Sequence, residues 1–462
     1  MRRILRRQLY DNFHSLRFQL GLLALLLFFS VNGFVYSWKM EQQREEDARI
    51  EADVERIYES ATTVAEAADR SFKVISKPLG TEFMAEGGFN WFHDTVWVSA
   101  MWPPVRLDSM RTTNNWMRRF ELLDWTVIVR YVLSFLCIVL AYNAVSGELE
   151  SGTLRLVLAN PVSRSAFLGG KLLAHLATLQ VATVVGSLVS LLILSLHGVL
   201  ELNGQLAQSY LLFLLGSGAY ATLFLLLGAG ISVLTRNSAS ALVFLVTAWT
   251  LIVVVIPQTA YLVAVRAVAP TGNMGRWFGE FQREQQEALI AEGLFPRLPE
   301  IAATDGYNLE KRYARRIEEL VEEGDREIRG AYRRNQVQYD LARAIHMISP
   351  GYSFQYAVEA LLGAGVVRFQ SFHEQGYRYR DELRAFLREK DAVDPESPHV
   401  PFLATFMSTA ALDADEIPRF AQAELALEDR VAAGTTPIAI LILETGLAFL
   451  FAVVAFQRTE VG

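Results

Sequence analysis

Apolar residues gather in six long stretches along this chain, and polar residues gather between them. A helix needs about 20 apolar residues to cross the hydrocarbon core of a bilayer. The stretches of suitable length are Phe18–Ser37, Thr126–Ala144, Leu172–Leu196, Tyr210–Thr235, Ala239–Val263 and Pro437–Phe456. This pattern predicts a mainly α-helical membrane protein with six transmembrane helices, or spans.

Two charged blocks, 38–125 and 264–436, follow the first and fifth spans. From Ile50 to Ala68 apolar residues recur at steps of four and three, which is the spacing of a helix that buries one seam. The expected helices are Glu41–Phe72, ended by Pro78 and Gly80, then Leu309–Met347, ended by Ser349-Pro350-Gly351, then about Ser353–Leu362 and Gly376–Glu389. The best strand candidate is Thr95–Met101. We therefore expect both blocks to build one mostly helical domain on the outer side of the membrane.

Positive charges flank the spans on one side. An excess of Lys and Arg near span ends marks the cytoplasmic side, and residues 1–17 carry Arg2, Arg3, Arg6, Arg7 and Arg17. Alternation of the spans places the loop 145–171, the link at Arg236 and the tail 457–462 on that same side. Both termini are therefore expected in the cytoplasm, and both charged blocks outside.

The first 17 residues interleave apolar side chains with arginines, which predicts an amphipathic helix lying in the inner membrane interface. The alternative is a basic anchor without helical order. The apolar stretch that follows is longer than the roughly 7–15 residues of a signal peptide and lacks a small-residue cleavage site. We expect an uncleaved anchor.

Composition narrows the classes of function. The chain has 462 residues, 52% hydrophobic and 20% charged, and its net charge of −7 argues against a nucleic-acid partner. Cys137 is the only cysteine, so no disulfide can form within the chain. His-Glu-x-x-His and Gly-x-Ser-x-Gly motifs are absent, and Gly170-Lys171 lacks the earlier glycine of a phosphate-binding loop. We expect no catalytic residue, no metal site and no ATP hydrolysis by this chain.

One polar segment lies between the second and third spans, and we call it the cassette (residues 145–171). It contains Gly147-Glu148-Leu149-Glu150-Ser151-Gly152-Thr153-Leu154-Arg155, then Asn160-Pro161-Val162-Ser163-Arg164, then Gly170-Lys171. The two glycines interrupt helix, and the spacing predicts a short amphipathic element, Thr153–Ala159, flat under the bilayer. Such an element could dock a cytoplasmic partner, and the alternative is an ordinary interfacial loop.

The cassette resembles the cytoplasmic coupling region of ABC type-2 permeases, the membrane subunits of ATP-binding-cassette exporters. The resemblance covers nearly the whole chain, and its further matching features are Trp249, Pro257, Arg236-Asn237-Ser238, Ile348-Ser349-Pro350 and Ile417-Pro418-Arg419-Phe420. The layout is similar to the subgroup with large outer domains after the first and fifth spans. Leu149 departs from the family pattern, which often has a basic residue there.

The resemblance implies a six-span subunit that pairs with a second permease, the same or a related chain, and binds two copies of a separate ATPase. That ATPase would hold ATP and Mg, and this chain would hold no cofactor. The coupling residues implied are Glu148, Glu150, Gly152, Thr153, Leu154, Arg155, Pro161 and Arg164. The implied location is a bacterial inner membrane, with an archaeal membrane as the alternative.

Two charges fall inside predicted spans. Arg130 and Glu444 each lie several residues from the outer end of a span, about 7–10 Å deep at a rise of about 1.5 Å per residue. Similar depth and opposite sign suggest an ion pair. The alternative is that Arg130 reaches the outer surface alone and Glu444 faces a hydrated cavity.

Three functions remain open from the sequence. The first is an export permease. The second is a mechanical transmitter, in which ATP hydrolysis inside rearranges the outer domain and nothing crosses the membrane. The third is a membrane receptor, which the short cytoplasmic segments disfavour. The substrate is not specified by any motif.

Overall fold

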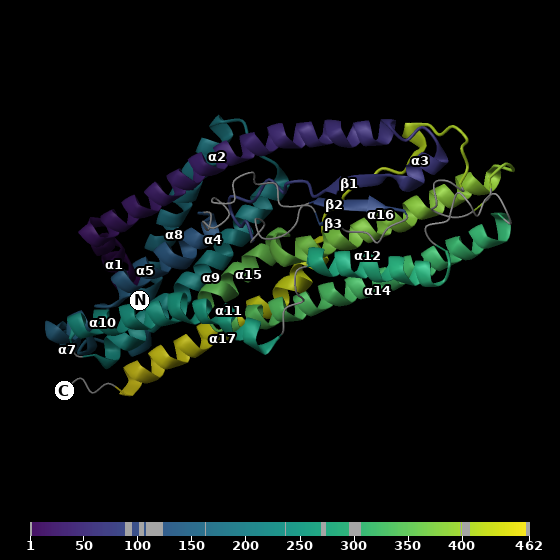
Figure 1. Cartoon of the computed structure of the whole chain (residues 1–462). Coiled ribbons are helices and arrows are strands. Elements are labelled where there is room, and N and C mark those ends of the chain that lie inside the picture. The colour runs from purple at the N-terminus through teal and green to yellow at the C-terminus, as the bar shows by residue number, and fades with distance from the viewer. Residues whose placement is uncertain are drawn as a thin grey trace.

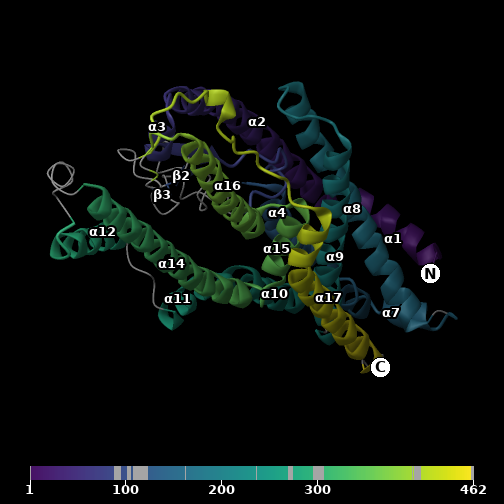
Figure 2. The same cartoon turned by 90° about the vertical axis from the view of Figure 1, so that its right-hand side faces the viewer.

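The computed structural model describes residues 2–87, 95–100, 106–107, 123–161, 163–235, 237–268, 274–294, 306–397, 399 and 407–458. Val162 and Arg236, named above, lie outside these residues. Figure 1 shows an elongated molecule, with both termini and the short helix α7 (Thr153–Leu158) at one end, which we call the terminal end. The opposite end carries the distal domain (Figures 1 and 2). It is built from a small sheet and the helices α3 (Val64–Asp69), α12 (Met274–Ala291), α14 (Gly306–His346) and α16 (Gly365–Val393).

Within the described residues, six helices are long and apolar enough to cross a membrane. They are α2 (Leu16–Glu59), α4–α6 (Trp125–Glu150), α8 (Arg164–Leu196), α9 (Gly204–Leu234), α10–α11 (Ser238–Ala267) and α17 (Leu427–Arg458). Polar caps fix several of their starts. Asn203, for example, accepts a hydrogen bond from the Leu206 amide at the start of α9. The predicted mainly α-helical membrane protein is therefore confirmed.

Two of these helices contain a π-helical turn. The second comprises α4 (Trp125–Val127), η3 (Ile128–Leu133), α5 (Ser134–Ala141) and α6 (Ser146–Glu150), and the fifth comprises α10 (Ser238–Trp249), η4 (Thr250–Val255) and α11 (Ile256–Ala267). The Trp249 indole donates a hydrogen bond of 2.8 Å to the Ser134 hydroxyl, which links the two irregular regions. Such turns widen a helix locally and recur at functional sites.

The distal domain has its own apolar core. Strands β1 (Ser71–Ile75), β2 (Thr95–Ser99) and β3 (Arg106–Leu107) form an antiparallel sheet in the order β1-β2-β3. Phe72 pairs with Val98 and Val74 pairs with Val96, so four apolar side chains share one buried face. They pack with residues of α16 (Gly365–Val393), such as Leu383, in a core separate from that of the spans.

The expected helix Glu41–Phe72 is wrong in its second half. Helix α2 ends at Glu59, and Thr63 caps a new helix, α3 (Val64–Asp69). The Thr63 hydroxyl accepts the Glu66 amide at 3.2 Å, and Glu66 accepts the Thr62 amide at 2.8 Å. This reciprocal capping overrides the apolar seam of the sequence. Phe72 then lies in β1, where a period of two replaces the helical period.

The other expected elements occur with shifted bounds. The candidate strand Thr95–Met101 contains β2 (Thr95–Ser99), while Met101 lies outside the described residues. The long charged helix is α14 (Gly306–His346), which lies beside α12 (Met274–Ala291). Pro350 does not only stop that helix: it is the first residue of α15 (Pro350–Leu362). The last expected helix, Gly376–Glu389, is the central part of the longer helix α16 (Gly365–Val393). A short turn, η6 (Ala414–Glu416), precedes α17.

Helix α15 lies between the spans and the distal domain. Nearly all its residues are buried, and it contacts α4, η3, α9, η4 and α17 of the spans as well as α16. Gly351 permits this close packing, because a Cβ atom there would lie 2.8 Å from Cγ of Arg130. Helix α15 therefore provides one packed connection between the spans and the distal domain.

Candidate functional site

The cassette forms two short helices with a sharp turn between them. Helix α6 ends at Glu150, and Gly152 precedes α7 with a φ of 70°, in the left-handed region that favours glycine. The Thr153 hydroxyl donates a hydrogen bond to the Glu148 carboxylate across this turn. The turn therefore sets α7 at a fixed angle to the second span.

Three charged side chains of the cassette reach neighbouring spans. Glu148 pairs with Lys171 of α8 at 2.8 Å, and the same ammonium donates to the Ala144 carbonyl at 2.8 Å. Glu150 accepts hydrogen bonds from the Ser238 amide, at 2.8 Å, and from its hydroxyl, at 2.7 Å, at the start of α10. This carboxylate also suits the positive end of the helix dipole.

Arg164 makes the third connection. Its guanidinium donates to the Phe456 carbonyl at 2.9 Å and to the Gln457 carbonyl at 3.1 Å, at the end of α17. These carbonyls belong to the last turn of a helix, where no further amide of the helix can satisfy them. Within the cassette, the Glu148–Lys171 pair joins α6 to the first turns of α8, and the Glu150 and Arg164 contacts reach α10 and α17, whose residues lie far away in the sequence.

The remaining predicted coupling residues divide by exposure. Leu154 is buried against the core of the spans, whereas Arg155 and Pro161 are exposed. Leu156 was not predicted, yet its side chain is 70% exposed on α7. Residues two positions apart in a helix lie on different sides, so a buried Leu154 implies an exposed Leu156. This spacing is the signal in the sequence that could have identified Leu156. α7 therefore presents an exposed surface of mixed apolar and basic character.

The intramembrane charges do not form the predicted ion pair. Arg130 donates to the Gln355 side chain and, at 3.0 Å, to the Tyr131 hydroxyl. Its guanidinium carbon lies 4.5 Å from the Tyr131 ring centre and 4.4 Å from that of Tyr352. Within the described residues, no ion pair joins Arg130 to Glu444. Arg130 instead contacts the two tyrosine rings and the side-chain oxygen of Gln355 on α15.

Glu444 of α17 lies beside Ser353, which is on α15, as is Gln355, the partner of Arg130. Arg130 and Glu444 therefore contact the same helix from two different spans. A similar expected depth does not distinguish a direct pair from contacts to a third element. No periodicity of the spans could have shown α15 between them.

Acidic groups are buried around α15 at the boundary of the spans. The Glu359 carboxylate accepts the Gln355 side-chain amide at 2.6 Å, and burial raises its pKa to about 7. Asp124, which caps α4 through the Val127 amide at 2.8 Å, has its pKa raised to about 6 by burial. We call Arg130, Gln355, Glu359 and Asp124 the α15 layer. Sequence reasoning identified only Arg130 of these four.

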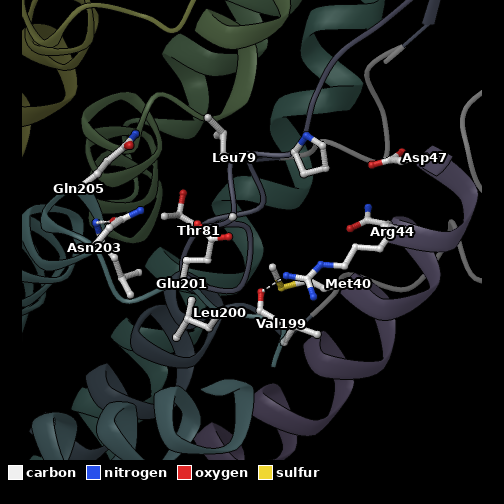
Figure 3. Close-up of a pocket in the computed structure, with 14 residues that line it drawn as sticks. Met40, Arg44, Asp47, Leu79, Thr81, Val199, Leu200, Glu201, Asn203 and Gln205 are labelled. Carbon is white, nitrogen blue, oxygen red and sulfur yellow. Dashed lines mark hydrogen bonds between the residues drawn. The ribbon is translucent and has the colours of Figure 1, made fainter. Parts of the chain in front are cut away.

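A cavity of about 230 Å³ opens between α2, the 78–81 segment and the loop before α9 (Figure 3). Arg44 crosses its wall and donates to the Gly198 carbonyl at 2.8 Å and the Val199 carbonyl at 3.2 Å. The lining also contains Asp47 and Glu201, so charges of both signs face it. This mixture indicates no single class of ligand. The described residues also contain no group of three or more potential metal ligands.

Comparisons with known proteins agree with this architecture. The chain matches the family described as "ABC-2 family transporter protein" over residues 3–461. It is also 39% identical over 61 residues to "Probable ABC transporter permease protein NosY" of Pseudomonas aeruginosa. That alignment covers 13% of this chain and 22% of the relative, so the chain spans about a fifth of that protein's length. The family match extends over nearly the whole chain and coincides with six membrane-crossing helices, and the chain belongs to the ABC-2 family of transporter proteins.

Proposed function

We propose that this chain is the permease subunit of an ATP-binding-cassette exporter, and that α7 receives the movement of a separate ATPase. The carrying observation is that the exposed α7 lies between α6 and α8, whose charged residues Glu148, Glu150 and Arg164 make polar links between the spans. A force on α7 would reach α8 through Glu148, α10 through Glu150 and α17 through Arg164. The family membership and the relative described as an ABC transporter permease support this assignment.

The proposal includes the orientation and the assembly. The terminal end, with both termini and α7, would face the cytoplasm of a bacterial inner membrane, and the distal domain would lie outside. A second permease chain and two ATPase copies would complete the transporter, and ATP and Mg would bind to the ATPases. Excess arginine at the N-terminus supports this orientation.

A second function, mechanical transmission without transport, is favoured by α15. This helix contacts five elements of the spans, α4, η3, α9, η4 and α17, and also α16 of the distal domain. An ATP-driven tilt of the spans would therefore move the distal domain whether or not a substrate crosses. The two functions share the cassette and differ only in what happens at the distal end.

The test is purification of the tagged full-length chain from its native membrane in mild detergent, followed by identification of bound proteins and an ATPase assay. The informative variant is Gly152→Pro, because proline fixes φ near −65° and removes the amide that donates to the Leu149 carbonyl at 3.1 Å. Gly198→Pro is the matched control. Gly198 has a φ of 66°, donates to the Ser195 carbonyl at 3.0 Å and lies at the other end of α8.

We expect an ATPase to co-purify with the wild-type chain. We expect its coupled activity to fall by about tenfold in Gly152→Pro, which corresponds to about 1.4 kcal/mol of activation free energy, and to change little in Gly198→Pro. Equal losses in the two variants would assign the effect to general destabilisation. If the wild-type chain brings down no ATPase under conditions that preserve other complexes, the proposal is contradicted.

A further inference from the structure

Helix α1 (Arg2–His14) is fixed to the spans along one face. Asn12 is buried and donates to the Thr178 hydroxyl of α8 at 3.1 Å, and its amide nitrogen lies 3.1 Å from Nδ1 of His175. Ile4, two turns earlier, packs against the core of the spans. The helix is therefore held at a defined position on α8 and is not a loose extension.

The other face of α1 is strongly basic and exposed. Its exposed arginines are Arg2, Arg3, Arg6 and Arg7. Arg7 lies 3.8 Å from Asp11, with both side chains largely in solvent, and Arg2, Arg3 and Arg6 form no ion pair within the described part of the chain. Asp11 is the single acidic residue of the helix. One exposed aspartate neutralises little of the charge of four arginines, so this face keeps a concentrated positive charge that can attract an external anion.

Aromatic side chains lie on the same exposed surface. Tyr10 is 65% exposed and Phe13 is 42% exposed, and only Ser15 separates α1 from α2. Ser15 has an extended backbone, the chain bends between α1 and α2 in Figure 1, and α2 begins with the exposed Leu16. Further exposed leucines, Leu20 and Leu23, continue along α2. The exposed face of α1 is thus continuous with the lipid-facing surface of the first span.

We propose that this face of α1 binds the headgroups of acidic phospholipids in the leaflet at the terminal end. Guanidinium groups match phosphate oxygens in geometry and charge, and the Tyr10 and Phe13 rings are suited to the boundary between headgroups and acyl chains. A docking protein would favour a face directed away from the bilayer. Continuity with the surface of α2 favours lipid, and this inference does not depend on the proposed coupling function.

The experiment compares two lipids on the full-length chain in a neutral detergent. Short-chain phosphatidylglycerol and phosphatidylcholine of equal acyl length are titrated separately, and bound lipid is measured by native mass spectrometry. The test variant combines Arg2→Gln, Arg3→Gln, Arg6→Gln and Arg7→Gln. The matched control removes the same charge from exposed positions of α14 with Arg312→Gln, Arg315→Gln, Arg333→Gln and Arg334→Gln.

For the wild-type chain we expect phosphatidylglycerol to bind about tenfold more tightly than phosphatidylcholine, with the preference falling as salt rises. The test variant should lose this preference and the control should keep it. The double variant Arg3→Gln/Arg6→Gln should give an intermediate value, which guards against misfolding of the quadruple variant. Each variant should also elute from size-exclusion chromatography as the wild type does.

Three results would overturn the proposal. An unchanged preference in the α1 variant would exclude these arginines as the lipid site. An equal loss in the α14 control would reduce the effect to net charge. If the α1 variant lost a co-purifying protein while keeping its lipid preference, the basic face would be a protein-docking surface instead.

Discussion

The cassette and the α15 layer both connect helices through charged side chains, but in opposite environments. Glu150 of the cassette is exposed where it caps α10, and Arg164 is only half-buried. In the α15 layer, Arg130 and Glu359 are buried, and Asp124 is buried as well. Exposed polar contacts contribute little free energy and exchange readily with water. Buried ones are costly to leave unpaired.

The difference assigns different mechanical roles to the two regions. The Glu150 and Arg164 contacts of the cassette can break and re-form at low cost, so they are suited to follow a moving partner, whereas the Glu148–Lys171 pair is more buried. The α15 layer should move as one unit with the spans, because separating its members would leave buried polar groups without partners.

The strongest test replaces the central residue of the α15 layer. Arg130→Ala removes contacts to Gln355, Tyr131 and Tyr352 and leaves a cavity among buried groups. We expect the free energy of unfolding in micelles to fall by about 3–5 kcal/mol. Arg155→Ala, at an exposed position of the cassette, should change it little. Similar losses from both variants would remove the contrast between the two regions.

The second test uses the pH dependence of Glu359. The unfolded carboxyl titrates near its usual pKa of 4.5, whereas the folded pKa is about 7. Between these values the folded state keeps a proton that the unfolded state has lost, so stability falls as pH rises and the penalty is complete above pH 7. Glu359→Gln removes this penalty and should stabilise the chain by about 3 kcal/mol above pH 7.

Thermal unfolding at several pH values measures this effect. The gain from Glu359→Gln should disappear below about pH 4.5, where both states of the wild-type carboxyl are protonated. Glu374→Gln makes the same change of charge at an exposed position of α16 and is the matched control. A gain that stays constant with pH would mean that Glu359 does not titrate as a buried acid.

A smaller effect is expected at the cassette. Lys171→Met keeps the side-chain volume but removes the ammonium that contacts Glu148 and the Ala144 carbonyl. Because the Lys171 side chain is only 9% exposed, we expect the free energy of unfolding to fall by about 2 kcal/mol. A denaturant titration in micelles measures this loss. Lys77→Met, at an exposed position, should be near neutral. A loss as large as that of Arg130→Ala would show that the cassette is as rigid as the α15 layer.

The fold was largely predictable where composition alone decides the outcome. Continuous apolar stretches such as Leu172–Leu196 can only be satisfied in lipid or in a large core, so the six membrane-crossing helices follow from the sequence. The break after Glu59 was not predictable, because Thr63 capping competes with a helical seam of nearly equal strength. The π-helical turns η3 and η4 also leave no mark on hydropathy.

The candidate site was predictable only as a segment. The cassette, with its glycines and charged residues, is visible in the sequence, but its partners are not. Ser238 lies 88 residues from Glu150, and Phe456 lies 292 residues from Arg164. Contacts over such separations depend on how the spans pack. The same limit explains the Arg130–Glu444 hypothesis: depth could be estimated from the sequence, whereas the position of α15 between the two could not.

The most direct test of the central claim, that exposed α7 docks a separate ATPase, is quantitative co-purification with a charge placed on α7. Leu156→Asp alters a side chain that is 70% exposed, and Leu202→Asp alters one that is 75% exposed in the loop before α9. Neither substitution disturbs the core. The proposed function predicts that the ATPase recovered per permease falls by about tenfold in Leu156→Asp, as for an interface anchor, and stays at the wild-type level in Leu202→Asp. Wild-type recovery in both variants would contradict the assignment of α7 as the docking element.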